Sequence, residues 1–255
     1  MKPGPENPIV FLHIPKTAGQ TIHNELAAWV GAPNVSPVRV HSQVRPGERQ
    51  MPPGYALYSG HIDWTELDLL PPARLVLTVL RDPRERIASF YFFLLHEAQA
   101  LSPQDLALHH NTGKQRILTA PAEAYFFGGD RGWQRFICDH YDNFYCSYFA
   151  TRKMRGLRLI EKLPEAEVIR RALAGLRAMD GVYDIGALDR LEDDFHARTG
   201  HRLHLTGNYR NAGQHAREQP RWPLLLERMD SDAGRRRLED FVTRDLALLD
   251  ALNRG

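Results

Sequence analysis

The chain has 255 residues, of which 43% are hydrophobic and 25% are charged, a composition that is ordinary for a globular protein and excludes a disordered or fibrous chain. Its 33 basic and 31 acidic residues leave a net charge of +2, so no overall basic field marks a nucleic-acid-binding protein, and specific basic residues must carry any anion binding. The length suffices for one α/β domain with a real core, and we expect a single domain over residues 1–255.

Apolar runs alternate with helical patterns along the chain. Strands are predicted at 8–14, 55–58, 75–80, 181–185 and 202–205. Helices are predicted at 21–30, from Pro83 to Leu95, and near 103–109, 131–140, 164–178, 188–198 and 232–252. The Pro/Gly-rich segment 31–54 reads as a long loop with a functional or lid role. This alternation predicts an α/β protein with an open, mostly parallel sheet, whose ligands bind beyond the carboxyl ends of the strands.

The cysteines and the first residues of the chain suggest its compartment. Cys138 and Cys146 make neither a disulfide framework nor a metal-ligand pattern, which favours a reducing compartment. The N-terminal apolar run is too short for a signal peptide or a membrane anchor. Together with the arginine-rich composition, these features lead us to expect a bacterial, cytoplasmic protein without a membrane span.

The stretch HIPKTAGQT (residues 13–21) joins the first predicted strand to the first predicted helix. A helix that begins directly after a strand presents unpaired N–H groups and a positive dipole end, which together favour an anion. Lys16 adds a full charge, Thr17 and Thr21 add hydroxyl groups, and Gly19 lets the backbone approach a ligand closely. The same residues are equally compatible with an ordinary strand–helix turn that has a capping threonine.

The order of lysine and glycine in this stretch bears on the kind of phosphate. A nucleoside-triphosphate P-loop reads G-x-x-x-x-G-K-[ST], with its lysine after the glycines. Here Lys16 precedes the single glycine. This order disfavours a triphosphate–magnesium site, whereas a lone 5′-phosphate with a second group attached remains compatible with it.

A second polar stretch, LRDPRERIASFYFF (residues 80–93), follows the third predicted strand. Arg81 lies at the carboxyl end of that strand. Ser89 follows about two helical turns later, at ~3.6 residues per turn, a spacing at which both side chains can face one phosphate.

The two stretches together resemble the sulfotransferases that use 3′-phosphoadenosine 5′-phosphosulfate (PAPS), in their carbohydrate branch, and especially the uronyl 2-O-sulfotransferases of the heparan sulfate type. The resemblance is best over residues 8–97, and it implies a three-layer, P-loop NTPase-like fold with a central, mostly parallel sheet flanked by helices. In that family a P-K-T-x-x-[ST]-type turn binds the 5′-phosphosulfate; Pro15, Lys16 and Thr17 match its first three residues, and Thr21 lies one residue beyond the position of its hydroxyl. The family's R-D-P-x-x-R-x-x-S motif grips the 3′-phosphate, which implies that role for Arg81 and Ser89.

A third segment, YALYSGHIDWTEL (residues 55–67), is similar to the family segment H-G-H-V that contains the catalytic histidine. His61 takes the place of the second histidine, and Ser59 takes the place of the first. The resemblance therefore implies that His61 is the base that accepts the proton of the acceptor hydroxyl.

The resemblance also implies roles for the rest of the site. Lys16 clamps the bridging oxygen and the 5′-phosphate as negative charge builds there. The backbone around the same group is expected to come from Thr17, Ala18, Gly19, Gln20 and Thr21. We expect no metal, because no histidine or cysteine cluster has ligand spacing.

Three other stretches carry weaker expectations. One of Arg84 and Arg86 is expected to reach the acceptor or the sulfate while the other is solvated. The polar segment 205–217 either closes over the adenosine or is an ordinary loop. The aromatic run YDNFYCSYF (141–149) is expected to be core rather than an acceptor groove.

The leading hypothesis is a PAPS-dependent sulfotransferase that acts on a hydroxyl of a carbohydrate or glycoconjugate. One alternative is a small-molecule or nucleotide kinase with a divergent P-loop, which would need magnesium and ATP. The other is a nucleotide-binding module without catalysis, which would keep Lys16 and Arg81 but make no use of His61. The sequence names neither the acceptor nor the oligomeric state.

Overall fold

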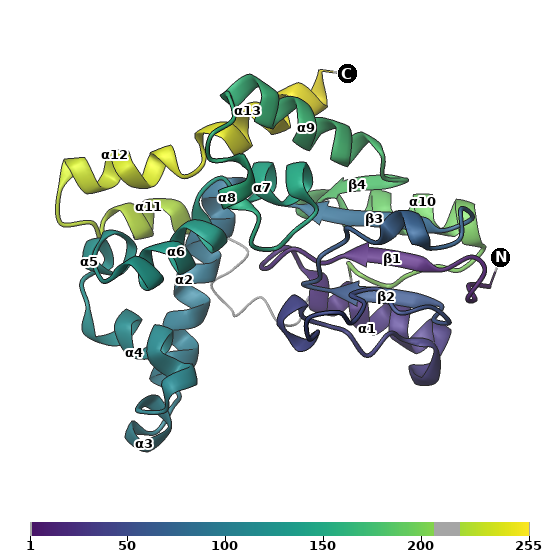
Figure 1. The fold of residues 1–255 in the computed structure, drawn as a ribbon, viewed down its shortest axis with the longest axis horizontal. Coiled ribbons are helices and arrows are strands. Elements are labelled where there is room, and N and C mark those ends of the chain that lie inside the picture. The colour runs from purple at the N-terminus through teal and green to yellow at the C-terminus, as the bar shows by residue number, and fades with distance from the viewer. Residues whose placement is uncertain (1, 207–219, 255) are drawn as a thin grey trace. The chain divides into compact units, whose positions relative to one another are not determined.

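The computed structural model describes residues 2–206 and 220–254. It has the predicted α/β class, with a four-stranded, all-parallel sheet that is flanked by helices (Figure 1). The chain forms two compact units, one of Met1–Arg81 with Ser147–Arg217 and one of Asp82–Cys146 with Glu218–Gly255. Each unit is therefore assembled from two separate stretches of sequence. The expectation of a single domain over residues 1–255 stays a prediction.

The first unit contains the sheet. Its strands are β1 (Ile9–Leu12), β2 (Leu57–Gly60), β3 (Leu75–Leu80) and β4 (Gly181–Asp184), in the order β2-β1-β3-β4. Ile9 is opposite Leu57 on one side and Leu75 on the other, so β1 is paired along both edges. The predicted second strand, 55–58, lies two residues later in the structure because its pairing with β1 runs from Leu57 to Gly60.

Helices α1 (Gly19–Val30) and α10 (Leu188–Thr199) pack on one face of the sheet. Phe11 and Leu77 of the strands share a buried cluster with Leu26 of α1 and Leu191 of α10. The strand residues that point to the opposite face, such as Val10, are buried as well. Burial on both faces explains why these strands read as continuous apolar runs. The first unit also holds α8 (Leu157–Ile160) and α9 (Glu165–Arg177).

The fifth predicted strand, 202–205, is not a strand in the structure. Leu203 and Leu205 are fully buried in the cluster beneath the sheet, which accounts for the alternating pattern. The backbone N–H groups of Leu205 and Thr206 donate to the carboxylate of Glu192 instead of to a neighbouring strand. Alternating burial without a partner strand misled the prediction, because side-chain acceptors satisfy this backbone.

The strand order creates a switch point at the carboxyl ends of β1 and β3. The chain continues from β1 to β2 on one side, whereas β4 lies on the other side of β3. In open parallel sheets, ligands bind at the point where the connections from two neighbouring strands lead to opposite sides of the sheet. The segment after β1 is the turn that contains Lys16, and the residue after β3 is Arg81.

The second unit is helical. Its elements are α2 (Pro83–Gln99), α3 (Pro103–Leu106), α4 (Thr112–Thr119), α5 (Ala122–Phe127), α6 (Arg131–Tyr141), the first residues of α7 (Phe144–Thr151), α11 (Arg221–Leu226), α12 (Asp232–Asp240) and α13 (Thr243–Asn253). Asp82 caps α2 by accepting from the N–H groups of Arg84 and Glu85, and Pro83 occupies the first turn. Tyr125 and Tyr141 are buried here, as expected for an aromatic core. No helix in the described part of the chain is long and apolar enough to cross a membrane.

The single helix predicted at 232–252 is two helices, α12 and α13, and Asn143 explains the break. The side chain of Asn143 donates to the carbonyl of Asp240 at 3.1 Å, at the end of α12. The side-chain amide oxygen (Oδ1) of Asn143 accepts from the N–H groups of Arg244 and Asp245, at the start of α13. One side chain from a distant stretch therefore caps both helix ends, a tertiary effect that helical periodicity does not reveal.

Arg86 and Asp245 are two charged side chains buried in this unit. Asp245 accepts from the N–H groups of Tyr145 and Cys146, which lie in the first turn of α7. The guanidinium of Arg86 lies over the ring of Phe144, and its Nη2 donates to the carbonyl of His140. Burial raises the pKa of Asp245 to about 6, although the backbone donors and Arg86 oppose the shift. Arg86 is thus part of the core and is not solvated.

The raised pKa makes the fold depend on pH through Asp245. Because the folded state holds the proton of this carboxyl more tightly than the unfolded state, its contribution to stability is largest below about pH 4 and is lost as the pH rises through 6. Asp245→Asn cannot ionise, so the stability advantage of the wild type over the variant should shrink between pH 4 and 6. The expected change is about 1.4 kcal/mol for each pH unit between the two pKa values. Urea unfolding at several pH values measures it, and a constant difference would contradict the assignment.

Candidate active site

The turn after β1 uses two residues in the left-handed region. Lys16 has a φ of 73° and Ala18 a φ of 62°, a conformation that is uncommon for residues other than glycine and is often found at functional sites. Thr17 between them is buried and donates its hydroxyl to the carbonyl of Ile14 at 2.9 Å. Ala18 is the N-cap of α1, and no side chain caps this helix end. The turn is therefore not built on a capping threonine, and the start of α1 can receive an anion.

Gly19, the first residue of α1, lies directly under the ring of His13. A Cβ on Gly19 would overlap this ring, so only glycine permits the arrangement. The next two residues, Gln20 and Thr21, form hydrogen bonds within α1 and its turn. Gln20 is exposed and its amide donates to Asn24 at 2.7 Å, and the N–H of Thr21 donates to the carbonyl of Ala18.

His61 follows β2 directly and is held by the end of β1. Its Nδ1 lies 2.7 Å from the carbonyl oxygen of His13. Because a carbonyl only accepts, Nδ1 carries the proton and Nε2 keeps its lone pair in the neutral ring. The ring centroids of His13 and His61 are 4.2 Å apart. His61 is thus fixed in the tautomer that a general base requires, and His13 lies between it and the turn.

His23 and Arg39 complete this group of side chains. The Nε2 of His23 accepts from the Nη1 of Arg39, so its Nδ1 carries the proton and donates to the hydroxyl of Ser59 at 3.1 Å. Ser59, which takes the place of the family's first histidine, therefore contacts His23. The structure places another histidine, His13, next to His61.

The three histidines are held neutral. Burial is the largest cause that lowers the pKa of His13 and of His61, and nearby Arg39 lowers both further. The hydrogen bond to His13 partly opposes this effect for His61. The pKa of His23 falls to about 4 through burial and Arg39. Neutral imidazole is the form that accepts a proton.

Arg81 and Ser89, which were expected to face one phosphate, belong to different units. Ser89 is buried, and its hydroxyl accepts from the Nη1 of Arg221 at 3.1 Å. Of the two neighbouring arginines, Arg84 is exposed and Arg86 is buried. The expectation that 205–217 closes over adenosine falls mostly outside the described residues.

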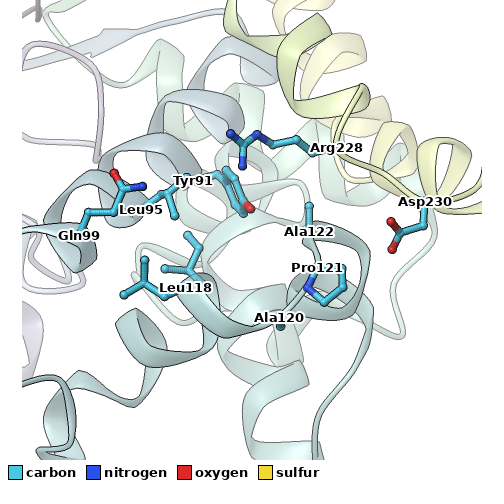
Figure 2. Close-up of a pocket in the computed structure, with 10 residues that line it drawn as sticks. Tyr91, Leu95, Gln99, Leu118, Ala120, Pro121, Ala122, Arg228 and Asp230 are labelled. Atoms are coloured by element: carbon cyan, nitrogen blue, oxygen red, sulfur yellow. The ribbon is translucent and has the colours of Figure 1, made fainter. Parts of the chain in front are cut away.

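A separate hollow lies in the second unit and involves none of the predicted site residues. It has a volume of about 410 Å³ and is lined by Tyr91, Leu95, Gln99, Ile117, Leu118, Ala120, Pro121, Ala122, Arg228 and Asp230. Figure 2 shows the Arg228 guanidinium beside the Tyr91 ring. Among the described residues, no group of three or more His, Cys, Asp or Glu side chains could hold a metal ion.

Sequence reasoning found the turn and His61 but missed His13, His23 and Arg39. His13 could have been found from strand register, because Phe11 is opposite Ser59 and the next residues on the same face are His13 and His61. His23 looked like any other polar residue on the first helix. Arg39 lies in segment 31–54, whose path no local pattern indicates.

The tautomer of His61 can be measured directly. We expect long-range ¹H–¹⁵N NMR spectra to show His61 protonated at Nδ1 near neutral pH, with a titration midpoint below the ordinary value of about 6.5. A midpoint above 6.5, or a proton on Nε2, would contradict the arrangement described above.

Comparison with models of known protein families finds no family that matches this chain, and comparison with curated proteins finds no matching relative.

Proposed function

We propose that the chain is a sulfotransferase that moves the sulfuryl group of PAPS to a hydroxyl of a carbohydrate or glycoconjugate. One observation carries the proposal: a histidine in the base tautomer and an uncapped helix N-terminus with a lysine follow two adjacent strands of one sheet. Transfer of a charged group to a hydroxyl requires both a base and a site for the leaving anion. The motifs that resemble the PAPS-dependent family select the sulfuryl group from among the groups that such a site can transfer.

The reaction assigns one role to each part of this site. The Nε2 of His61 accepts the proton of the acceptor hydroxyl as its oxygen attacks sulfur. A new oxygen–sulfur bond forms, and the bond between sulfur and the bridging oxygen of the 5′-phosphate breaks. Adenosine 3′,5′-bisphosphate leaves with the electron pair of that bond. Positioning and electrostatics do most of the catalysis in such transfers.

Lys16 and the backbone of Thr17, Ala18, Gly19 and Gln20 receive the negative charge that builds on the leaving 5′-phosphate, whereas the N–H of Thr21 is used within the turn. The left-handed backbone of Lys16 and Ala18 and the uncapped start of α1 support this role, because successive N–H groups in such a turn can bind an anion. The motif match, rather than their placement, carries the proposal that Arg81 and Ser89 bind the 3′-phosphate. The proposed cofactor is therefore recognised at both of its ends.

The cofactor can be tested by calorimetry. We expect adenosine 3′,5′-bisphosphate to bind more tightly than ATP with magnesium. Arg81→Ala should weaken the binding of the bisphosphate by at least ~1.5 kcal/mol, the lower range for a charge-assisted contact. This loss raises the Kd more than tenfold. Arg158→Ala, at an exposed position of α8, is the matched control and should bind like the wild type. Tighter binding of ATP with magnesium would favour the kinase reading.

Catalysis by His61 separates an enzyme from a binding module. His61→Ala should bind the bisphosphate as the wild type does, because the residue acts on the acceptor side. It should convert PAPS to the bisphosphate in the presence of mixed polysaccharide acceptors at least about 100-fold more slowly, the usual loss for a general base. Equal PAPS turnover by the two proteins would instead support a nucleotide-binding module.

A further inference from the structure

Arg39 is held at the site by the backbone of its loop. Segment 35–40 runs alongside β2, with isolated parallel bridges from Val35 to Leu57 and from Val40 to His61. The carbonyl of Arg39 accepts from the N–H of His61 at 2.8 Å. It also lies where a Cβ on Gly60 would be, so the glycine before His61 allows this close approach. Arg39 and the proposed base are therefore fixed to each other through the main chain.

The guanidinium of Arg39 has no anionic partner among the described residues. Its Nη1 donates to the neutral ring of His23, and its Nε is buried without a hydrogen-bond partner in that part of the chain. Burial alone lowers its pKa, with no carboxylate opposing the shift. A half-buried cation without a counter-ion is costly unless a ligand supplies one. After burial, the charge of Arg39 is a further cause that lowers the pKa of both His13 and His61.

We propose that Arg39 binds an oxyanion of the reacting molecules beside His61. This inference rests on the proposed function and adds a residue to it that none of the sequence motifs contains. A guanidinium matches two oxygens of a sulfuryl group or of a carboxylate through its planar fork. The oxyanion is either the sulfuryl group of PAPS, whose oxygens carry the charge during transfer, or an acidic group of the acceptor. In both cases Arg39 fixes the anion relative to the base that it is tied to.

The test uses Arg39→Gln, because a glutamine amide can still donate to His23 while the charge is lost. Arg45→Gln is the matched control, since Arg45 lies in the same loop, is exposed, and its side chain forms no hydrogen bond or ion pair among the described residues. Binding of PAPS and of adenosine 3′,5′-bisphosphate is measured for each protein. Binding of glucuronate and of glucose to the bisphosphate complex is measured alongside. The Nδ1 proton of His61 in NMR spectra shows whether the site keeps its structure.

If Arg39 binds the sulfuryl group, Arg39→Gln should weaken the binding of PAPS about tenfold or more. The affinity for the bisphosphate should be unchanged. If Arg39 binds an acidic group of the acceptor, Arg39→Gln should weaken only the binding of glucuronate. The binding of glucose should be unaffected. A variant that keeps the His61 tautomer and loses none of these affinities overturns the inference. So does an equal loss in Arg45→Gln, which would reflect general charge.

Failure of the proposed function has a different signature. In that case the wild type binds neither PAPS nor the bisphosphate, and inorganic sulfate becomes the probe. Thermal stabilisation by sulfate that disappears in Arg39→Gln but persists in Arg45→Gln would still support the oxyanion site. Equal stabilisation of all three proteins would overturn it.

Discussion

The hydrogen bond from the imidazole of His61 to the main-chain carbonyl of His13 ties the ends of two neighbouring parallel strands together. It depends on the β1–β2 register, which brings residues 13 and 61 side by side. It also decides the chemistry of the ring, because it fixes which nitrogen keeps a lone pair. Gly19 and Gly60 serve the same contact, since Gly19 leaves room for the ring of His13 and Gly60 leaves room for the carbonyl of Arg39 that accepts from the N–H of His61. The two glycines are thus required by the packing of the site rather than by a chemical role.

The charges of the first unit follow a consistent pattern around this contact. Burial lowers the pKa of His13 most, and the charges of Arg39 and Lys16 lower it further, so the ring stays neutral. Neutral rings can pack against one another and against the backbone without the large penalty of buried charge. The positive charge of this group of side chains is carried by Lys16 and Arg39. A site of this kind attracts an anion and keeps its base ready at the same time.

Much of the fold could be predicted from the sequence, because buried parallel strands are apolar on both faces and four of them were found near their true positions. Errors arose where distant residues decide the outcome. Glu192 replaces a partner strand at 205–206, and Asn143 divides the C-terminal helix. The site shows the same limit. Lys16 and His61 belong to local motifs, whereas Arg39 reaches the site only because its loop follows β2.

The burial of Asp245 under the start of α7 has a consequence for synthesis on the ribosome. The carboxylate that caps α7 and offsets the charge of Arg86 comes from a residue about 100 positions later than α7 itself. While residues 82–146 emerge, Arg86 has no acid to balance it, and the two N–H groups at the start of α7 lack their acceptor. The contacts that join Arg86, the start of α7 and Asp245 are therefore completed only after α13 has been made.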